Sequence, residues 1–243
     1  MTGKHIQRLD KFLADMEIGT RKEVKKYIKG GRVRVDDVIA ASPEQKVDPS
    51  VQKVCFDEHP VIYVTNVYYM MNKPAGVLSA TEDRRQQTVL DLFPDDYYTK
   101  DVFPVGRLDK DTTGLLVLTN DGALAHQVLS PKKHVPKCYE AEIKGKVTEE
   151  DVTAFAEGLV MDEDWTTLPA TLTILRSDEI SQIRVVIYEG KYHQVKRMFE
   201  TVGKEVLTLK RLSMGALSLD PALMEGQVRV MTPDEVEALR KRG

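Results

Sequence analysis

The chain has 243 residues, of which 42% are hydrophobic and 30% charged, which suits one or two globular domains with a sizeable core. Its apolar runs stay below the roughly 18 residues of a membrane span, and its first residues are polar rather than signal-like. The two cysteines, Cys55 and Cys138, are too few for a disulfide framework. We therefore expect a cytoplasmic protein without a membrane partner.

The net charge of −3 conceals a division along the chain. Residues 1–34, including Lys4, hold ten lysines and arginines against four acidic residues, so the remainder carries nine negative charges in excess. A basic segment on an acidic body is the electrostatic pattern of a protein that contacts nucleic acid. The alternative is that these lysines form an ordinary solvated helix face.

Residues 1–60 predict a small domain of two helices followed by two strands. Periodicity places these elements over residues 6–16, 21–29, 33–35 and 38–40. Thr20 and Glu23 have the spacing of a capping box at the start of the second helix, and Gly30-Gly31 ends it. Prolines follow in a loop-rich exit, so we place the domain boundary near residue 60.

This order of elements resembles the S-four-like RNA-binding module. The resemblance rests on Arg8-Leu9-Asp10-Lys11-Phe12-Leu13, on Thr20-Arg21 and on Gly30-Gly31-Arg32-Val33-Arg34-Val35. It makes eight basic residues candidates for RNA contacts: Arg8, Lys11, Arg21, Lys22, Lys25, Lys26, Arg32 and Arg34.

Residues 61–243 predict a strand-rich α+β domain. Strands are expected over residues 68–71, 102–105, 115–118, 139–143, 172–175, 182–187 and 206–209. Helices are expected over residues 123–129 and 191–202, with a last one opening at Pro233.

The run over residues 106–122 is the most distinctive in the chain. It reads Gly-Arg-Leu-Asp-Lys-Asp-Thr-Thr-Gly-Leu-Leu-Val-Leu-Thr-Asn-Asp-Gly, a polar loop that feeds an apolar strand. A carboxylate among cations and hydroxyls, on a loop anchored by a buried strand, suits a reactive group. The plainer alternative is a solvated loop with a structural ion pair.

This run closely resembles the signature of the pseudouridine synthases, in which the Asp of Gly-Arg-Leu-Asp is catalytic. The resemblance implies that Asp109 is the catalytic carboxylate and that Arg107 contacts a phosphate beside the flipped nucleotide or supports the loop. It also implies a catalytic domain over residues 61–243, built on a mixed, mostly antiparallel sheet flanked by helices.

Two further motifs extend the resemblance. They are Asn72-Lys73-Pro74-Ala75-Gly76 and Glu-Gly-Lys-Tyr-His-Gln-Val-Lys-Arg-Met-Phe over residues 189–199. The family likeness implies that Lys196 pairs with Asp109, that Tyr139 stacks on the target base, and that Lys73 shapes the pocket wall. Without it, Lys196 reads as the exposed side of a helix and Tyr139 as core. His193 has no clear task in the reaction, so we assign it to structure.

The implied chemistry agrees with a single motif carboxylate. Glycoside hydrolases use two carboxylates because one must activate water, whereas the isomerisation of uridine consumes none. Asp109 would act as an anion, either attacking the ribose or base covalently or stabilising positive charge on the sugar, and both readings stay open. A glycosidase or nucleosidase would need a second carboxylate, for which Asp111 and Asp121 are the candidates.

We therefore predict an isomerase that converts a uridine of ribosomal RNA to pseudouridine during ribosome biogenesis. The wording of the 189–199 motif resembles the small-subunit (16S) branch, and the partner is free RNA or an assembly intermediate. We expect a monomer that needs neither metal nor organic cofactor; His126, His134 and Cys138 lack the spacing of a zinc site. The rival from another class is a non-catalytic RNA-binding or ribosome-assembly factor on the same fold.

Overall fold

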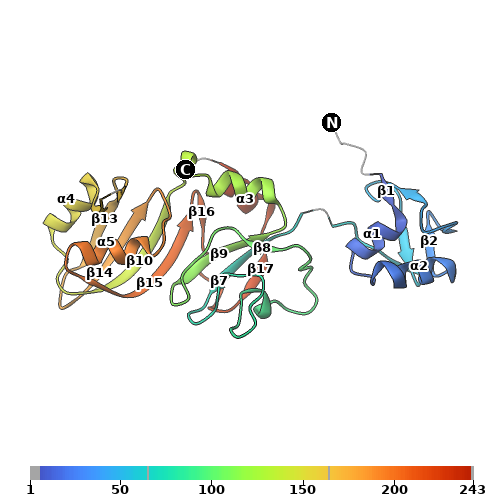
Figure 1. Ribbon diagram of the computed structural model, residues 1–243, viewed down its shortest axis with the longest axis horizontal. Helices are drawn as coiled ribbons and strands as arrows, with labels where there is room; N and C mark the ends of the chain where they lie inside the picture. Colours follow the sequence, from blue (N-terminus) through green and yellow to red (C-terminus); the bar gives the residue numbers. More distant parts are fainter. Residues whose placement is uncertain (1–5, 65, 164, 242–243) are drawn as a thin grey trace. The chain divides into compact units, whose positions relative to one another are not determined.

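The computed structural model describes residues 6–64, 66–163 and 165–241, and the chain divides into two compact units, residues 1–66 and 67–243 (Figure 1). Lys4, which belongs to the basic segment of the sequence, lies outside the described residues. Within them, every helix is too short or too polar to serve as a membrane span.

The first unit packs two helices against short strands. Its elements are β1 (Gln7–Arg8), α1 (Leu9–Asp15), α2 (Arg21–Lys29), β2 (Val33–Val35), β3 (Val38–Ile39), β4 (Lys46–Val47), β5 (Val54–Phe56) and β6 (His59–Pro60). The sheet has the strand order β3-β2-β5-β6, and β1 pairs separately with β4. Leu9, Phe12 and Leu13 of α1 and Val24 and Ile28 of α2 form its core with inward residues of the strands.

The second helix has the predicted bounds. Thr20 Oγ1 accepts a hydrogen bond from the backbone N of Glu23, and the Glu23 carboxylate accepts one from the backbone N of Thr20 at 2.8 Å, which completes the capping box. The hairpin is also confirmed, because Asp36 and Asp37 both have positive φ, as a two-residue turn between β2 and β3 requires. The first helix is shorter than expected, since Gln7–Arg8 pair with β4 instead.

The second unit is built on one large sheet. Its longer strands are β7 (Tyr68–Lys73), β9 (Thr113–Thr119), β10 (Lys137–Lys144), β13 (Thr171–Arg176), β14 (Ile180–Ile187) and β15 (Glu205–Met214). Its shorter strands are β8 (Phe103–Pro104), β16 (Leu217–Ser218) and β17 (Val228–Val230), while β11 (Val160–Asp162) and β12 (Trp165–Thr166) form a separate two-stranded sheet. Its helices are α3 (Gly122–Leu129), α4 (Glu149–Glu157), α5 (Gln194–Thr201) and α6 (Pro233–Arg240), with 3-10 turns η1 (Leu90–Leu92) and η2 (Pro131–Lys133).

The strand order of this sheet is β13-β14-β10-β15-β9-β7-β17, with β16 on β15 and β8 on β9. Neighbouring strands run antiparallel except β9 and β15, which are parallel. The predicted α+β fold with a mixed, mostly antiparallel sheet is therefore confirmed. The parallel contact falls at Gly114, where a Cβ atom would overlap the backbone of Arg211, so only glycine lets β9 and β15 approach.

The sheet carries an apolar core on each face. Along β9, Leu116 and Leu118 belong to one core and Leu115 and Val117 to the other, as the two-residue period of a strand requires. Helices α4 and α5 contribute to the first core, and α3 and α6 contribute to the second. A strand buried on both faces has a continuous apolar sequence, which is the pattern of residues 115–118.

Two helices differ from the sequence expectation. Helix α4 was not predicted, and α5 begins at Gln194 rather than at residue 191. The later start of α5 follows from His193, whose left-handed conformation (φ 51°) cannot continue a helix. This conformation turns the chain at the point where α5 meets the motif loop of Asp109.

Candidate active site

A cavity of about 120 Å³ lies beside the loop that precedes β9. Its wall includes residues 106–109 of that loop, Tyr139 of β10, His193 at the start of α5, and Arg211 of β15. Asp109 is the only carboxylate among the described residues that line it. Segments far apart in sequence thus surround one carboxylate.

Asp109 faces a cation supplied by α5. The Nζ atom of Lys196 lies 3.5 Å from Asp109 Oδ2, and the two side chains are 19% and 25% exposed. Partial burial strengthens such a pair, because water screens it less than it would on an open surface. The geometry therefore agrees with the predicted pairing of Lys196 with Asp109.

Lys196 also contacts a second carboxylate. Its Nζ donates to Asp111 Oδ1 at 2.6 Å, and this hydrogen bond is the main cause that lowers the pKa of Asp111 below its ordinary value. The Asp111 side chain is 72% exposed and does not belong to the described wall of the cavity. Lys196 thus bridges a partly buried carboxylate and a solvated one, a contact that the sequence did not indicate.

His193, which we assigned to structure, lies at the cavity. Its Nε2 atom is 3.6 Å from Asp109 Oδ1, and its ring stacks on the exposed ring of Tyr192 with centroids 3.8 Å apart. The left-handed backbone that delays the start of α5 therefore also brings an imidazole to the catalytic candidate. The motif contained this residue, but its spacing alone did not predict the contact.

Lys73 supports the loop from beneath. It is fully buried, and its Nζ donates to the carbonyl oxygens of Pro74, Asp109, Lys110 and Thr112 at 3.0–3.2 Å. Burial lowers the pKa of Lys73 to about 8. It is not among the described residues that line the cavity. Its contacts hold the Asp109 loop in shape rather than form the pocket wall.

Tyr139 and Arg107 both line the cavity, as expected for substrate contacts. Tyr139 is 7% exposed, and its side chain also belongs to the apolar core. It is therefore both a core residue and a residue of the cavity wall. Arg107 is exposed at the mouth of the cavity and of a neighbouring groove that continues to Leu78 and Tyr192. These positions leave Tyr139 inside the cavity and Arg107 at its edge.

Two basic residues of the cavity were not singled out in the sequence. Lys137 lies two residues before Tyr139 on β10, and burial together with the charge of Arg211 lowers its pKa to about 8. Arg211 is 2% exposed on β15 and donates from Nε to the carbonyl oxygen of Leu115 at 2.8 Å. The sequence signal that could have identified Arg211 is the alternation of side chains along β15, which places Arg211 on the same buried face as Leu209.

Two carboxylates proposed for a hydrolase have other contacts. Asp121 is the N-cap of α3, accepting from the backbone N of Ala123 and Leu124, and it also accepts from the Tyr68 hydroxyl. Asp111 binds Lys196 outside the cavity wall. Neither provides a second carboxylate across the cavity from Asp109.

The basic residues of the first unit fall into two groups. Three arginines have acidic partners within the unit: Arg8 binds Asp10 and Glu44, Arg32 binds Asp57 and stacks over Tyr27 and Phe56, and Arg34 binds Glu58. Lys25 is 3.9 Å from Asp10. The remaining candidates are exposed and have no ion pair within the described residues: Lys11, Arg21, Lys22 and Lys26.

Comparison with known families gives both units a class. A family model described as RNA pseudouridylate synthase matches residues 67–201, and an S4 domain model matches residues 7–52. The first match covers more than half of the chain. The chain therefore belongs to the RNA pseudouridylate synthase family and carries an N-terminal S4 domain, as the motifs predicted.

Relatives of similar length extend over almost the whole chain. The uncharacterized RNA pseudouridine synthase YtzG of Bacillus subtilis (strain 168) is 50% identical over 96% of this chain and 98% of its own. The ribosomal small subunit pseudouridine synthase A of Vibrio cholerae is 39% identical over 96% of this chain and all of its own. A crystal structure of a pseudouridylate synthase superposes with a TM-score of 0.67 at 35% identity, covering 96% of this chain and 99% of that one.

Proposed function

We propose that this chain converts a uridine of small-subunit ribosomal RNA to pseudouridine, with Asp109 as the catalytic carboxylate. The observation that carries the proposal is the cavity in which Asp109 is the only carboxylate of the described wall, beside Lys196 and Tyr139. A hydrolase would need a second carboxylate to activate water, whereas this isomerisation consumes no water.

The reaction exchanges one bond of the base for another. The bond from C1′ of the ribose to N1 of uracil breaks, a bond from C1′ to C5 forms, and the proton of C5 is lost while N1 gains one. The base must leave its stack and stay in the pocket between these steps. Tyr139 would hold its face, and Asp109 would act as an anion beside the ribose, with Lys196 as its counter-charge.

The substrate class comes from the relatives and from the first unit. Relatives named ribosomal small subunit pseudouridine synthase A match over 96% of the chain. Four exposed basic residues of the S4 domain form no ion pair within its described part, which supports assigning them to phosphate contacts: Lys11, Arg21, Lys22 and Lys26. We assign Arg8, Arg32 and Arg34 mainly to holding the domain, and we expect a monomer acting on free RNA or an assembly intermediate.

The test is incubation of the purified chain with two transcripts, one of small-subunit and one of large-subunit ribosomal RNA. Pseudouridines are then mapped by the stops that a carbodiimide adduct causes in reverse transcription. The proposal predicts a new stop at one uridine of the small-subunit transcript. New stops confined to the large-subunit transcript would contradict the substrate class, and none in either transcript or in assembly intermediates would contradict the activity.

A further inference from the structure

Two buried polar atoms of the cavity residues have no hydrogen-bond partner within the described part of the chain. They are Oγ1 of Thr112 and Nη2 of Arg211, and both residues line the cavity of Asp109. Each residue is 2% exposed. A buried polar atom without a partner costs free energy, so two such atoms at the wall of a binding cavity point to a ligand that completes their bonds.

Other contacts already fix Thr112. Its backbone N donates to the carbonyl oxygen of Asp109 at 3.1 Å, and its carbonyl oxygen accepts from Lys73 Nζ at 3.0 Å. The backbone of Thr112 is therefore held without any contribution from its hydroxyl. A hydroxyl can both donate and accept, so Oγ1 can pair with an N–H group of a ligand.

Arg211 is held in a similar way. Its Nε donates to the carbonyl oxygen of Leu115, and β15 approaches β9 closely at Gly114. Since Nε is engaged, Nη2 is the buried donor that remains. Arg211 is directly opposite Tyr139 in the antiparallel pair of β15 and β10, so both side chains project to the same face of the sheet.

We propose that Thr112 and Arg211 hold the imide edge of the flipped uracil, with Thr112 Oγ1 accepting from N3–H and Arg211 Nη2 donating to a neighbouring carbonyl oxygen. This inference rests on the proposed function, which puts the face of the base on Tyr139. The edge of a base stacked there would meet the residue opposite Tyr139, which is Arg211.

The pair would also act during the reaction. When the C1′–N1 bond breaks, the electron pair that leaves with N1 spreads over the two carbonyl oxygens of uracil. A guanidinium donor already aimed at one of them stabilises this negative charge and keeps the base in place until C5 is joined to C1′. Lys137 also lines the cavity, and burial, followed by the charge of Arg211, lowers the pKa of Lys137 to about 8, so two basic side chains lie near each other at this wall.

The first test is Thr112→Val, with the neighbouring Thr113→Val as its matched control. Valine has nearly the shape of threonine, so removal of an unpartnered hydroxyl should leave the melting temperature unchanged or raise it. The single-turnover rate at saturating RNA should fall about tenfold for Thr112→Val, as for removal of one hydrogen bond, and remain at the wild-type value for Thr113→Val. A Thr112→Val rate within about twofold of wild type would overturn the Thr112 contact.

The second test uses transcripts with 2-thiouridine or 4-thiouridine at the target position. Sulfur accepts hydrogen bonds weakly, so one of the two substitutions should slow the wild-type protein. Arg211→Gln should react slowly with uridine and lose that preference for oxygen over sulfur. No thio effect in the wild type, or an equal effect in both proteins, would overturn the Arg211 contact.

Both tests separate this inference from the proposed function. If the wild-type protein and Thr113→Val form pseudouridine while Thr112→Val is equally fast, only the inference about the base edge fails. If the wild-type protein forms no pseudouridine in any ribosomal RNA substrate, the proposed function itself fails.

Discussion

Lys196 lies between two carboxylates that differ in exposure, and this difference defines its proposed role. Asp111 is largely solvated, so its ion pair with Lys196 adds little free energy, although this contact is the shorter of the two. Asp109 is partly buried, where an opposite charge matters more. We therefore expect the longer contact of Lys196 to be the one that affects the reaction.

The first prediction concerns Lys196→Met, which removes the charge but keeps much of the packing of the stem. The single-turnover rate should fall by about two orders of magnitude, as is typical when one preorganised group that stabilises a reacting charge is removed. RNA affinity should change only a few fold. Lys146→Met, which changes an exposed lysine of the same unit, is the control and should keep the wild-type rate.

A rate for Lys196→Met equal to that of the control would contradict this role. Lys196 would then be an ordinary side chain of the exposed face of α5.

The second prediction is that Asp111→Asn remains active. Lys196 loses its solvated partner but keeps Asp109 at 3.5 Å, so the rate should stay within about threefold of wild type. Single-turnover kinetics with the same transcript measure it. A decrease as large as that of Lys196→Met would instead make Asp111 part of the catalytic group.

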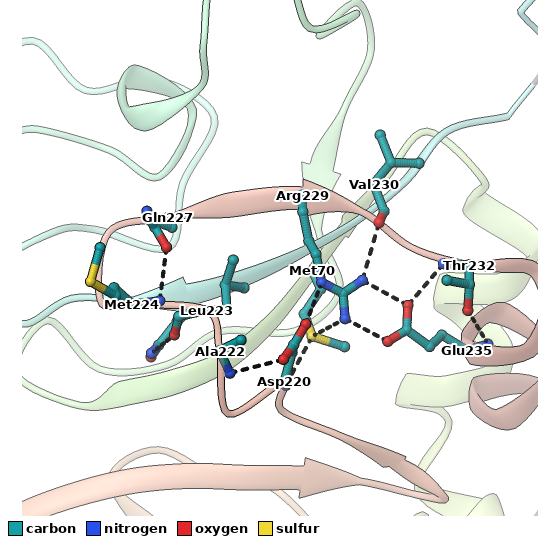
Figure 2. Close-up of polar contacts among 11 residues, drawn as sticks. Met70, Asp220, Ala222, Leu223, Met224, Gln227, Arg229, Val230, Thr232 and Glu235 are labelled. Carbon is teal, nitrogen blue, oxygen red and sulfur yellow. Dashed lines mark hydrogen bonds and ion pairs between the residues drawn. The ribbon is translucent and has the colours of Figure 1, made fainter.

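At the scale of elements, Arg229 connects the edge strand β17 to the last helix, α6, through hydrogen bonds (Figure 2). Its Nε donates to Asp220 at 2.8 Å, and its two Nη atoms donate to the carboxylate of Glu235 at 2.6 and 2.8 Å. Glu235 also accepts from the backbone N of Thr232 at 2.8 Å, so the same carboxylate completes the cap of α6. One arginine therefore joins β17, the loop before it and the start of α6.

The third prediction concerns the pH dependence of this network. The hydrogen bonds from Arg229 lower the pKa of Glu235 from 4.5 to about 2, a shift that corresponds to about 3 kcal/mol of unfolding free energy. Because the folded pKa is the lower one, this stabilisation is complete above pH 4.5 and disappears as the pH falls towards 2. Glu235→Gln should therefore be less stable than wild type at neutral pH, by a difference that narrows below pH 4.5.

Urea unfolding from about pH 7 down to about pH 3 measures this difference. Glu237→Gln, an exposed glutamate of the same helix, is the control and should match wild type throughout. If the loss of unfolding free energy in Glu235→Gln stayed constant with pH, the negative charge of Glu235 would not be the source of its stabilisation.

The elements that the sequence predicted well are those whose signals are local. Helix α2 has a capping box, an apolar face and a terminal glycine pair within a short segment, and its bounds were correct. Helix α4 opens with three consecutive acidic residues, and its capping box uses Asp151 in place of the usual Glu or Gln, so it was missed. Its packing against the first core, through Phe155, compensates for the weak local signal.

Long-range arrangement was harder to predict. The parallel contact of β9 with β15 joins Gly114 to Arg211, and no local pattern links two segments so far apart in sequence. The motifs predicted that Asp109 and Lys196 meet, because the family likeness related them. They did not indicate Arg211, which reaches the cavity through the pairing of β15 with β9 and β10.

At the scale of the whole molecule, the charge is divided between the basic first 34 residues, most of which belong to the S4 domain, and an acidic remainder. The exposed basic residues that form no ion pair in the described part of the S4 domain would supply the proposed phosphate contacts. The pocket residues all belong to the second unit. Binding and chemistry should therefore respond to different substitutions.

The fourth prediction follows from this division. Replacing Lys11, Arg21, Lys22 and Lys26 with Gln should weaken RNA binding and flatten the plot of log affinity against log salt. For each phosphate that is no longer neutralised, the slope should decrease by about 0.7 to 0.9. Arg34→Gln is the control, because its partner Glu58 already neutralises it, and it should leave the slope nearly unchanged. A quadruple variant with the wild-type slope would reduce these side chains to solvated surface.

The most direct measurement of the central claim is a comparison of wild type with Asp109→Asn, following RNA affinity and pseudouridine formation on the same small-subunit transcript. Asparagine is nearly isosteric, and the loop is held by the contacts of Lys73 with its backbone, so folding should survive. We predict RNA affinity within a few fold of wild type and no detectable product under single-turnover conditions. Measurable turnover by Asp109→Asn, at more than a trace of the wild-type rate, would contradict the assignment of Asp109 as the catalytic carboxylate.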